Sequence, residues 1–251
     1  MLRIIMRGCN GKMGRSITDI VKNDDDAVIV AGVDINNTQL SDYPVYASMG
    51  DIKEEADVII DFASALNLED LLNYGINKNV PMVLCTTAYS KEQLDMINEA
   101  SKKVAILRSA NMSMGINTMM KVLKAVSQTL ADAGFDIEIV EKHHNQKLDA
   151  PSGTALALAD VINESLNDEY SYIYDRSKEL KKRDKHEIGI SAVRGGTIVG
   201  EHEIIFAGTD EVIEFKHTAF SKAVFGKGAV QAGKFLKGKA PGMYDMSQVI
   251  G

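Results

Sequence analysis

The stretch LRIIMRGCNGKMG, Leu2 to Gly14, decides the fold class of this chain. Its apolar beginning, Leu2 to Arg7, predicts a buried β-strand, and a helix is expected from about Lys12. Three glycines follow the strand in a GxxGxxG spacing: Gly8, Gly11 and Gly14. Glycine lets such a turn approach a pyrophosphate closely, and the amides at the helix start stabilise negative charge. Because glycine also serves strand-to-helix turns for purely structural reasons, the interpretation needs support from elsewhere in the chain.

Asp34 supplies that support. It ends the next predicted strand, Ala27 to Asp34, twenty residues after Gly14. From this position a carboxylate can accept hydrogen bonds from both ribose hydroxyls of an adenosine. The structural alternative for Asp34 is a turn or cap residue. The order strand, glycine loop, helix, strand and acid favours a dinucleotide cofactor.

The residues after Asp34 bear on which nicotinamide cofactor is used. A carboxylate at this position repels a 2′-phosphate, and the next three residues supply no arginine to attract one: Ile35, Asn36 and Asn37. Lys12 in the glycine loop offsets part of the repulsion. The sequence therefore favours NADH over NADPH, or the use of both.

Further segments of the first half have the character of buried strands. They are DVIIDF, VPMVLCT and VAILRS, which begin at Asp57, Val80 and Val104, and helix-length amphipathic segments separate them. Apolar strands that alternate with helices are typical of a parallel sheet covered on both faces. The first half is therefore predicted to be an α/β, Rossmann-like dinucleotide-binding domain.

The pattern changes after Asn111. A long helix is expected from Met114 to Ala133, then a strand, FDIEIVEKHH, and a second helix from Gly153 to about Leu166. Three strand-like segments follow without helices between them: ISAVRGG, HEIIFAG and VIEFKHTAF. This succession predicts a second, α+β domain with an open sheet that is mixed or mostly antiparallel. The tail from Ser221 to Gly238 is again helical, and periodicity does not decide which domain it joins.

Composition excludes several classes of protein. The chain has 251 residues and a net charge of -7, which argues against a nucleic-acid binder. Cys9 and Cys85 lie far apart without zinc-ligand spacing or a disulfide framework, so a reducing cytoplasm is expected. We expect neither a signal peptide nor a membrane-spanning segment. The charged run SKELKKRDKHE, Ser177 to Glu187, is interpreted as a solvated surface loop or frayed helix end.

A second dense cluster lies in EIVEKHHNQKLDAPSGTA, Glu138 to Ala155. His143 and His144 end a predicted strand, so their side chains should point to opposite faces. Lys147 follows, and Ser152 is a plausible N-cap that leaves the first amides of its helix, those of Gly153 and Thr154, available to an anion. Adjacent histidines lack the spacing that brings two imidazoles onto one metal ion, so no metal is expected. The cluster predicts a receptor for a small carboxylate.

Joined to a dinucleotide domain, this receptor predicts reduction of a small anionic substrate, with proton donation from histidine or lysine. Two other interpretations stay open on the residues alone. One is another two-domain NAD-dependent dehydrogenase of a small anionic substrate. The other is a catalytically idle dinucleotide sensor, although such a protein would not need both His143 and Lys147.

The same cluster resembles the signature of the 4-hydroxy-tetrahydrodipicolinate reductases, the dihydrodipicolinate reductases of the diaminopimelate route to lysine. The matching positions are Glu138, Ile139, Glu141, His143, Lys147, Asp149, Pro151, Ser152, Gly153, Thr154 and Ala155. The likeness extends along the chain through GCNGKMGRSI, CTTA at Cys85 to Ala88, SANMSMGIN at Ser109 to Asn117, VRGG, GEHEIIFAG, KHTAFSK and the tail GKGAVQAGKFLKGKAPGMYDM.

The resemblance implies a domain organisation and an activity. Residues 1–112 and 222–251 would form the dinucleotide-binding domain, and residues 113–221 a substrate-binding domain whose open sheet builds a homotetramer. The reaction would be the NAD(P)H-dependent reduction of 4-hydroxy-tetrahydrodipicolinate, which loses water to give dihydrodipicolinate, to tetrahydrodipicolinate.

The resemblance also implies roles for single residues. His143 would donate or accept a proton, and Lys147 would be a second proton donor that also holds the substrate. His144 would contact one substrate carboxylate, and the amides of Gly153 and Thr154 would bind the other. The dinucleotide would be lined by Gly8, Cys9, Asn10, Gly11, Lys12, Met13, Asp34, Cys85, Thr86, Thr87, Ser109, Ala110, Asn111 and Met112.

The departures from the family pattern all lie in the cofactor motifs. They are Cys9, Asn10, Lys12, Cys85, Ala88 and Met112, together with the missing arginine after Asp34. They bear on cofactor preference and affinity, and none of them touches the Glu138 to Ala155 signature.

Overall fold

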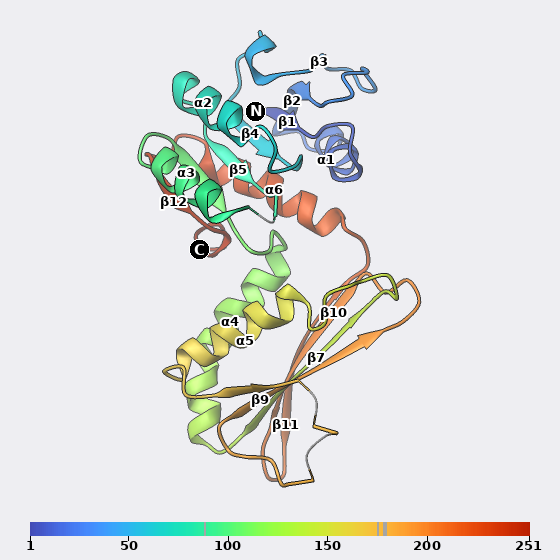
Figure 1. Ribbon diagram of the computed structural model, residues 1–251, viewed down its shortest axis with the longest axis vertical. Coiled ribbons are helices and arrows are strands. Elements are labelled where there is room, and N and C mark those ends of the chain that lie inside the picture. The colour runs from blue at the N-terminus through green and yellow to red at the C-terminus, as the bar shows by residue number, and fades with distance from the viewer. Residues whose placement is uncertain (88, 175, 178–179) are drawn as a thin grey trace. The chain divides into compact units, whose positions relative to one another are not determined.

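The computed structural model describes residues 1–87, 89–174, 176–177 and 180–251. The chain forms two compact units (Figure 1). The first unit comprises Met1–Met114 and Ala223–Gly251, and the second comprises Gly115–Lys222. Within the described ranges, no helix has both the length and the apolarity that a bilayer crossing requires.

The first unit contains a seven-stranded parallel sheet in the order β12-β6-β5-β4-β1-β2-β3. Its strands are β1 (Leu2–Arg7), β2 (Ala27–Val33), β3 (Val45–Tyr46), β4 (Val58–Asp61), β5 (Met82–Leu84), β6 (Ala105–Arg108) and β12 (Gly242–Tyr244). The strand order reverses between β1 and β4, and in such sheets ligands bind beyond the carboxyl ends of the strands at this reversal. The predicted doubly wound α/β fold is confirmed.

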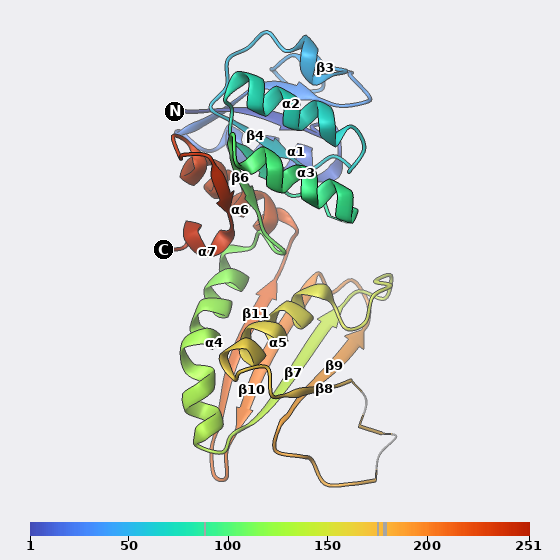
Figure 2. The same ribbon diagram turned by 60° about the vertical axis from the view of Figure 1, so that its left-hand side comes forward.

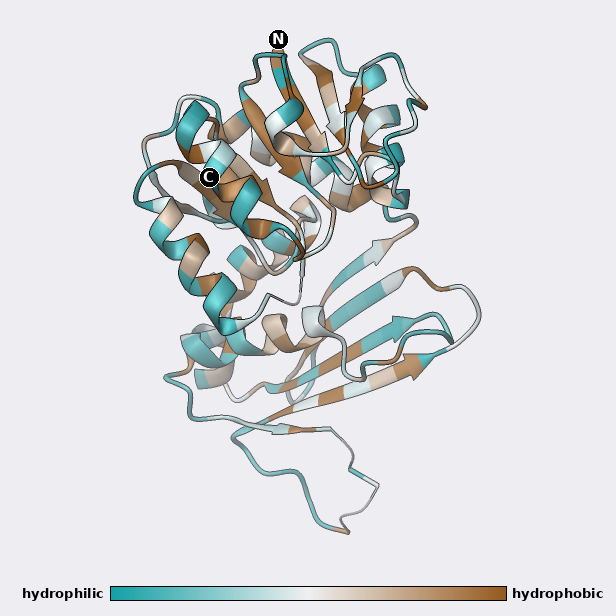
Figure 3. Cartoon of the chain, turned by 45° about the horizontal axis from the view of Figure 1, so that its top comes forward, coloured by the Kyte–Doolittle hydropathy of each residue, from teal (hydrophilic) through white to brown (hydrophobic). Residues whose placement is uncertain are grey.

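Helices cover both faces of this sheet. They are α1 (Lys12–Lys22), α2 (Leu68–Lys78), α3 (Lys91–Ser101) and α6 (Ala223–Leu236), with a short α7 (Met246–Val249) and the 3₁₀ turn η1 (Met49–Asp51). Helices α1 and α6 pack on one face, and α2 and α3 on the other. Neighbouring β1 residues such as Ile4 and Ile5 therefore enter different cores, and both are fully buried. This double covering explains why the strands of the first unit are apolar along most of their length (Figure 3).

The second unit contains a mixed five-stranded sheet in the order β11-β10-β7-β9-β8. Its strands are β7 (Asp136–His143), β8 (Ser171–Ile173), β9 (Glu187–Arg194), β10 (Gly200–Ala207) and β11 (Val212–Ala219). Strand β7 pairs antiparallel with β10 and parallel with β9. This arrangement confirms the prediction of an α+β part with a mixed sheet.

Among the residues that the structure describes, helices cover one face of this second sheet and leave the other face without a helix. Helix α4 (Met114–Asp132) and helix α5 (Gly153–Ser165) pack on the face that contains Ile137 and Ile139 (Figure 2). Strand β7 accordingly alternates between buried and partly exposed residues along its length. The opposite face carries an ion-pair group in which Glu201 binds both Lys142 and Lys216.

Some elements were not predicted from the sequence. Strands β3, β8 and β12 are two or three residues long, and β12 and α7 lie in a tail where only the end of a helix was expected. Such short strands owe their geometry to pairing with a neighbouring strand, which a local pattern does not reveal.

The interpretation of the charged run Ser177 to Glu187 as solvated is wrong for Arg183. Its side chain is 16% exposed and binds the carboxylates of Asp136 and Glu138 and the backbone oxygens of Ile137 and Glu187. It therefore fastens this segment to β7 and β9. Lys178 and Glu179 of the same run lie outside the described residues.

Candidate functional site

The glycine loop of the first unit lies at the carboxyl end of β1, beside the reversal of strand order. Gly8 has a φ of +80°, and a Cβ at this position would lie 2.9 Å from the backbone of Ala63. A Cβ at Gly14 would lie 2.2 Å from the Gly8 carbonyl oxygen. Gly11 is the N-cap of α1 and no side chain caps this helix. The loop thus combines a close backbone approach with an uncapped helix start, which fits a pyrophosphate group.

Asp34 follows β2 and is tied to the glycine loop. Its carboxylate accepts hydrogen bonds from the Asn10 amide at 3.0 Å and the Asn36 amide at 3.1 Å. The Asn10 side chain in turn donates to the backbone oxygens of Asn36 and Thr38. Because a carboxylate has about four lone-pair sites, Asp34 keeps capacity for ribose hydroxyls.

The remaining predicted cofactor residues follow the neighbouring strands. Those that continue from β5 are Cys85, Thr86 and Thr87, and those that continue from β6 are Ser109, Ala110, Asn111 and Met112. The structure therefore brings all the predicted cofactor residues to the carboxyl ends of β1, β2, β5 and β6, within one unit. Ala88, the last residue of the CTTA motif, lies outside the described residues.

Three of these side chains face the protein interior. Cys9 and Met112 are buried in the core beside α1 and α6, and burial raises the pKa of the Cys9 thiol to about 11. Burial also raises the pKa of Cys85. These residues can therefore offer a ligand their backbone groups rather than a reactive or polar side chain.

A buried ion pair beside this loop was missed from the sequence. The Arg7 Nη1 atom lies 2.7 Å from Asp61 Oδ1, and the Asp61 side chain is fully buried. Asp61 also accepts a hydrogen bond from the Thr86 hydroxyl at 2.8 Å, and Arg7 donates to the Leu66 carbonyl. The available signal was that a charged residue closes each of two mainly apolar strands, LRIIMR and VIID.

In the second unit, the predicted anion site begins at the end of β7. His143 lies on the helix-covered face and is 8% exposed, whereas His144 follows the strand and is partly exposed. The His143 Nδ1 atom lies 2.6 Å from Glu141 Oε2. Glu141 itself is fully buried at a position where the alternation of the strand would place an apolar residue.

Glu141 is the residue that joins the parts of this site. Its Oε1 accepts a hydrogen bond from the Ser152 amide at 2.9 Å. Arg194 forms a two-pronged pair with it, from Nη1 to Oε2 and from Nη2 to Oε1, both at 2.7 Å. Sequence reasoning assigned neither residue a role. The local sign of a role for Glu141 was a charged residue at a position of β7 where the alternation of the strand predicts burial.

Ser152 caps helix α5 as predicted, because its hydroxyl oxygen accepts a hydrogen bond from the Ala155 amide. The same oxygen lies 3.0 Å from His202 Nε2, on strand β10. His202 was also missed by sequence reasoning. His202 opens the strand-like segment HEIIFAG, and no residue near it in the sequence suggests a partner. The pairing of strands in the sheet brings it beside Ser152.

One of the two amides of α5 that were expected to bind an anion, that of Gly153, already has a partner within the chain. The Asp149 carboxylate interacts with the Gly153 amide and lies 2.8 Å from the Lys147 ammonium. Chiefly through the hydrogen bond from Lys147, the pKa of Asp149 is lowered. A carboxylate of the chain therefore interacts with two of the groups predicted to hold the substrate.

Burial favours the neutral form of two histidines at this end of the sheet, His143 and His202. Burial lowers the pKa of His143, and the neighbouring Glu141 offsets part of that effect. Burial, followed by the proximity of His143, lowers the pKa of His202 to about 4. The two rings meet edge to face with centroids 5.1 Å apart. Within the described ranges, no three histidine, cysteine or acidic side chains are grouped as metal ligands.

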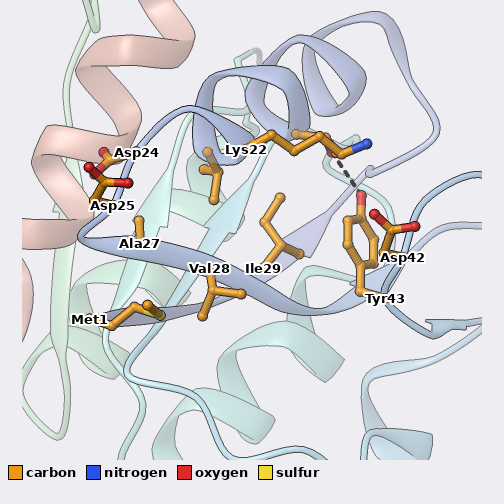
Figure 4. Close-up of a pocket in the computed structure, with 11 residues that line it drawn as sticks. Met1, Lys22, Asp24, Asp25, Ala27, Val28, Ile29, Asp42 and Tyr43 are labelled. Carbon is orange, nitrogen blue, oxygen red and sulfur yellow. Dashed lines mark hydrogen bonds between the residues drawn. The ribbon is translucent and has the colours of Figure 1, made fainter.

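A separate hollow of about 420 Å³ lies in the first unit beside α1 and β2 (Figure 4). Met1 and Ala27, at the amino ends of β1 and β2, line it, and the Tyr43 hydroxyl on its wall is hydrogen-bonded to Thr18. None of the predicted site residues lines this hollow. It lies toward the amino ends of the strands, whereas the glycine loop lies at their carboxyl ends.

Comparison with protein families accounts for both units. The family model for the N-terminal part of dihydrodipicolinate reductases matches residues 2–112, and the model for their C-terminal part matches residues 115–250. The chain belongs to the dihydrodipicolinate reductase family. It is a 4-hydroxy-tetrahydrodipicolinate reductase, an oxidoreductase of lysine biosynthesis, and this family uses NAD(P)H.

Reductases of this family from other organisms match along the whole chain. A 4-hydroxy-tetrahydrodipicolinate reductase of Clostridium tetani is 53% identical over 250 residues, covering 100% of this chain and 97% of its own. One from Caldanaerobacter subterraneus subsp. tengcongensis is 50% identical over 250 residues, covering 100% and 98%. The resemblance seen in the sequence is thus confirmed.

Solved structures support the same family and fold. The dipicolinate-bound dihydrodipicolinate reductase from Paenisporosarcina sp. TG-14 has a TM-score of 0.80 and 25% identity, covering 98% of this chain and 97% of its own. A diaminopimelate dehydrogenase of C. glutamicum has a TM-score of 0.59 and 12% identity, covering 100% and 95%, and shares the fold alone. The family matches favour the dihydrodipicolinate reductases over this wider group of dehydrogenases.

Proposed function

We propose that the cluster from His143 to Thr154 binds the dicarboxylate substrate and transfers its protons. The observation that carries this proposal is the buried carboxylate of Glu141, which binds both His143 and the amide of Ser152. Glu141 thereby holds an imidazole and a helix start together, and the Lys147 ammonium lies in the loop that joins them, paired with Asp149. A dicarboxylate needs cationic and amide donors at both ends, and this segment supplies them.

One substrate carboxylate replaces Asp149. It takes the hydrogen bonds of Lys147 and of the amides of Gly153 and Thr154, at the start of α5. His144 contacts the second carboxylate from the partly exposed end of β7. The exchange of one carboxylate for another keeps the charge of the site balanced.

His143 and Lys147 manage the protons. Arrival of a dianion next to a neutral imidazole raises its pKa, because a nearby negative charge favours the protonated ring. Lys147 protonates the C4 hydroxyl, which leaves as water, while the neutral His143 takes a proton from the adjacent ring carbon. His143 returns that proton to the same carbon once C4 has received a hydride. A bound NAD(P)H supplies the hydride to C4. Atoms balance as loss of water followed by addition of one hydride and one proton.

The cofactor is NADH in preference to NADPH. A 2′-phosphate would lie beside the Asp34 carboxylate, which is anchored by two backbone amides and is not displaced easily. No arginine follows Asp34 to compensate. Steady-state kinetics with each cofactor test this: a kcat/KM for NADPH far above that for NADH would refute the preference.

The assembly is a homotetramer built on the helix-free face of the second sheet. Val193 on this face is 44% exposed and Val212 is 57% exposed. The Lys142, Glu201 and Lys216 side chains lie among such apolar residues, as is common where a sheet meets a copy of itself. Size-exclusion chromatography with light scattering should give the mass of four chains, and the mass of a monomer at micromolar concentration would contradict this assembly.

The compartment proposed for the protein is the cytoplasm, because Cys9 and Cys85 are both free cysteines.

Following NADH absorbance tests the reaction itself. The substrate is made in situ from pyruvate and aspartate semialdehyde by a condensing enzyme, and NADH should be consumed only when this chain is present. Absence of NADH and NADPH oxidation would rule out the proposal. The substitution Glu164→Gln, on the exposed side of α5, is a surface control that should keep wild-type rates.

A further inference from the structure

Glu141 has an unusually complete set of hydrogen bonds for a single carboxylate. It accepts from the imidazole of His143, from the backbone amide of Ser152 and from both Nη atoms of Arg194. No part of its side chain is exposed. A buried charge persists only when it is paired and hydrogen-bonded, and this one is.

We propose that Glu141 is a positioning residue for the reductase reaction: it sets the tautomer of His143 and holds that imidazole in register with the carboxylate-binding start of α5. This inference rests on the proposed roles of His143 and the α5 amides. It assigns to Glu141 no contact with substrate or cofactor.

The tautomer follows from the donors around the carboxylate. The Ser152 amide and the Arg194 guanidinium can only donate, so Glu141 is ionised and can only accept. The pKa of Glu141 is lowered accordingly, with Arg194 and His143 as stabilising partners against the cost of burial. His143 Nδ1 must therefore carry a hydrogen. In the neutral ring, Nε2 then holds the lone pair that takes up a proton and later passes it on.

Arg194 allows Glu141 to orient His143 without keeping it charged. The guanidinium neutralises the carboxylate through two bonds and also donates to the Asp149 carbonyl at 2.7 Å. The charged or titratable groups around His143 are Glu141 on its own strand, Arg194 on β9, His202 on β10 and Lys147 in the loop. Of these, only Glu141 favours the protonated ring.

The same carboxylate fixes the helix start. Its Oε1 holds the amide of Ser152, the N-cap residue, while Oε2 holds the imidazole. Arg194 holds the loop before the cap through the Asp149 carbonyl. Movement of the glutamate would therefore displace His143 and the amides of Gly153 and Thr154 together.

The substitution Glu141→Gln tests this directly. A glutamine has one accepting oxygen and one donating NH₂ group. With its oxygen toward Ser152, its NH₂ faces Nδ1 and forces the hydrogen of His143 to Nε2. The wrong tautomer in a comparable acid–histidine pair costs about 10⁴-fold in kcat, and we expect a loss of about 10²- to 10⁴-fold with a KM within about threefold of wild type.

The ¹⁵N chemical shifts of His143, assigned by comparison with His143→Gln, report the tautomer without turnover. Wild type should show Nδ1–H and Glu141→Gln should show Nε2–H. An Nε2–H tautomer in the wild type, or a folded Glu141→Gln with unchanged kcat, would overturn the inference. These shifts stay informative even if the wild type proved inactive, an outcome that would refute the proposed function instead.

Glu141→Asp covers the case in which the glutamine variant does not fold. It keeps the charge but is one methylene shorter, so it cannot reach both His143 and Ser152. We expect the Nδ1–H tautomer to remain while kcat falls and KM rises together. Wild-type kcat and KM in this variant would show that the position of His143 relative to the start of α5 does not affect the reaction. Glu164→Gln, exposed on α5, is the matched control for handling and folding.

Discussion

The Lys147 ammonium lies 2.8 Å from the Asp149 carboxylate, two residues further along the same loop. Asp149 also interacts with the Gly153 amide at the start of α5. The loop thus holds a carboxylate of its own against the groups that we assign to the substrate, and substrate binding becomes an exchange of one anion for another.

Removal of the Asp149 charge should tighten substrate binding. Asp149→Asn frees Lys147 from its ion pair, so less interaction is lost when the substrate enters. The pair is partly exposed and such pairs are worth about 0.2–1 kcal/mol, so KM should fall by up to about fivefold. Initial-rate kinetics give the answer. Asp210→Asn, in the exposed β10–β11 turn, is the charge-matched control, and a KM above wild type would show that Asp149 assists binding.

Loss of either proton-transfer group should mainly lower kcat. His143→Gln and Lys147→Met should each reduce it by about 10²- to 10⁴-fold, the usual contribution of general acid catalysis. Single-turnover kinetics with NADH separate chemistry from product release. His186→Gln, an exposed histidine substitution in the same unit, should behave as wild type. A change confined to KM would show that the two residues bind the substrate and do not transfer protons.

The buried histidines should make the protein less stable in mild acid. His202 has a pKa of about 4 when folded and about 6.5 when unfolded, so the unfolded chain binds a proton first as the pH falls. Stability is complete above pH 6.5 and is lost progressively toward pH 4, by a total of the order of 3 kcal/mol for this group. His143 and His217 act in the same direction.

Denaturant unfolding between pH 4.5 and 7.5 measures this dependence, and His202→Gln should have a shallower profile than wild type. Equal slopes for the two proteins would mean that His202 does not titrate in this way. The pH-independent loss of its hydrogen bond to Ser152 should appear as a constant offset.

The Arg7–Asp61 pair should be important for stability near the cofactor loop. Arg7→Met leaves a fully buried carboxylate without its counter-ion, and breaking such a pair costs about 3–5 kcal/mol. Adding Asp61→Asn should recover part of the loss. Arg3→Met on the same strand, where the side chain is 42% exposed, should cost much less. Similar unfolding midpoints for the two single variants would contradict the importance of burial here.

The local sequence determined the parts of the fold that depend on near neighbours. The apolar strand followed by GxxGxxG predicted β1, the turn and the start of α1 at Lys12, because glycine requirements and helix starts are local. The capping role of Ser152 followed in the same way. Alternation of apolar strands with helices predicted the parallel sheet. The family signature pointed to the cluster between Glu138 and Ala155 as the candidate anion site.

Only the tertiary structure decided how those residues are held. Glu141 and Arg194 are separated by 53 residues, and Arg7 and Asp61 by 54, so no periodicity connects them. A buried carboxylate looks like an irregularity in a strand until its distant partner is known. Strands as short as β3 or β12 likewise form only against a neighbour. Local patterns report propensity and burial, whereas the compensation of buried charge depends on which distant segments the fold brings together.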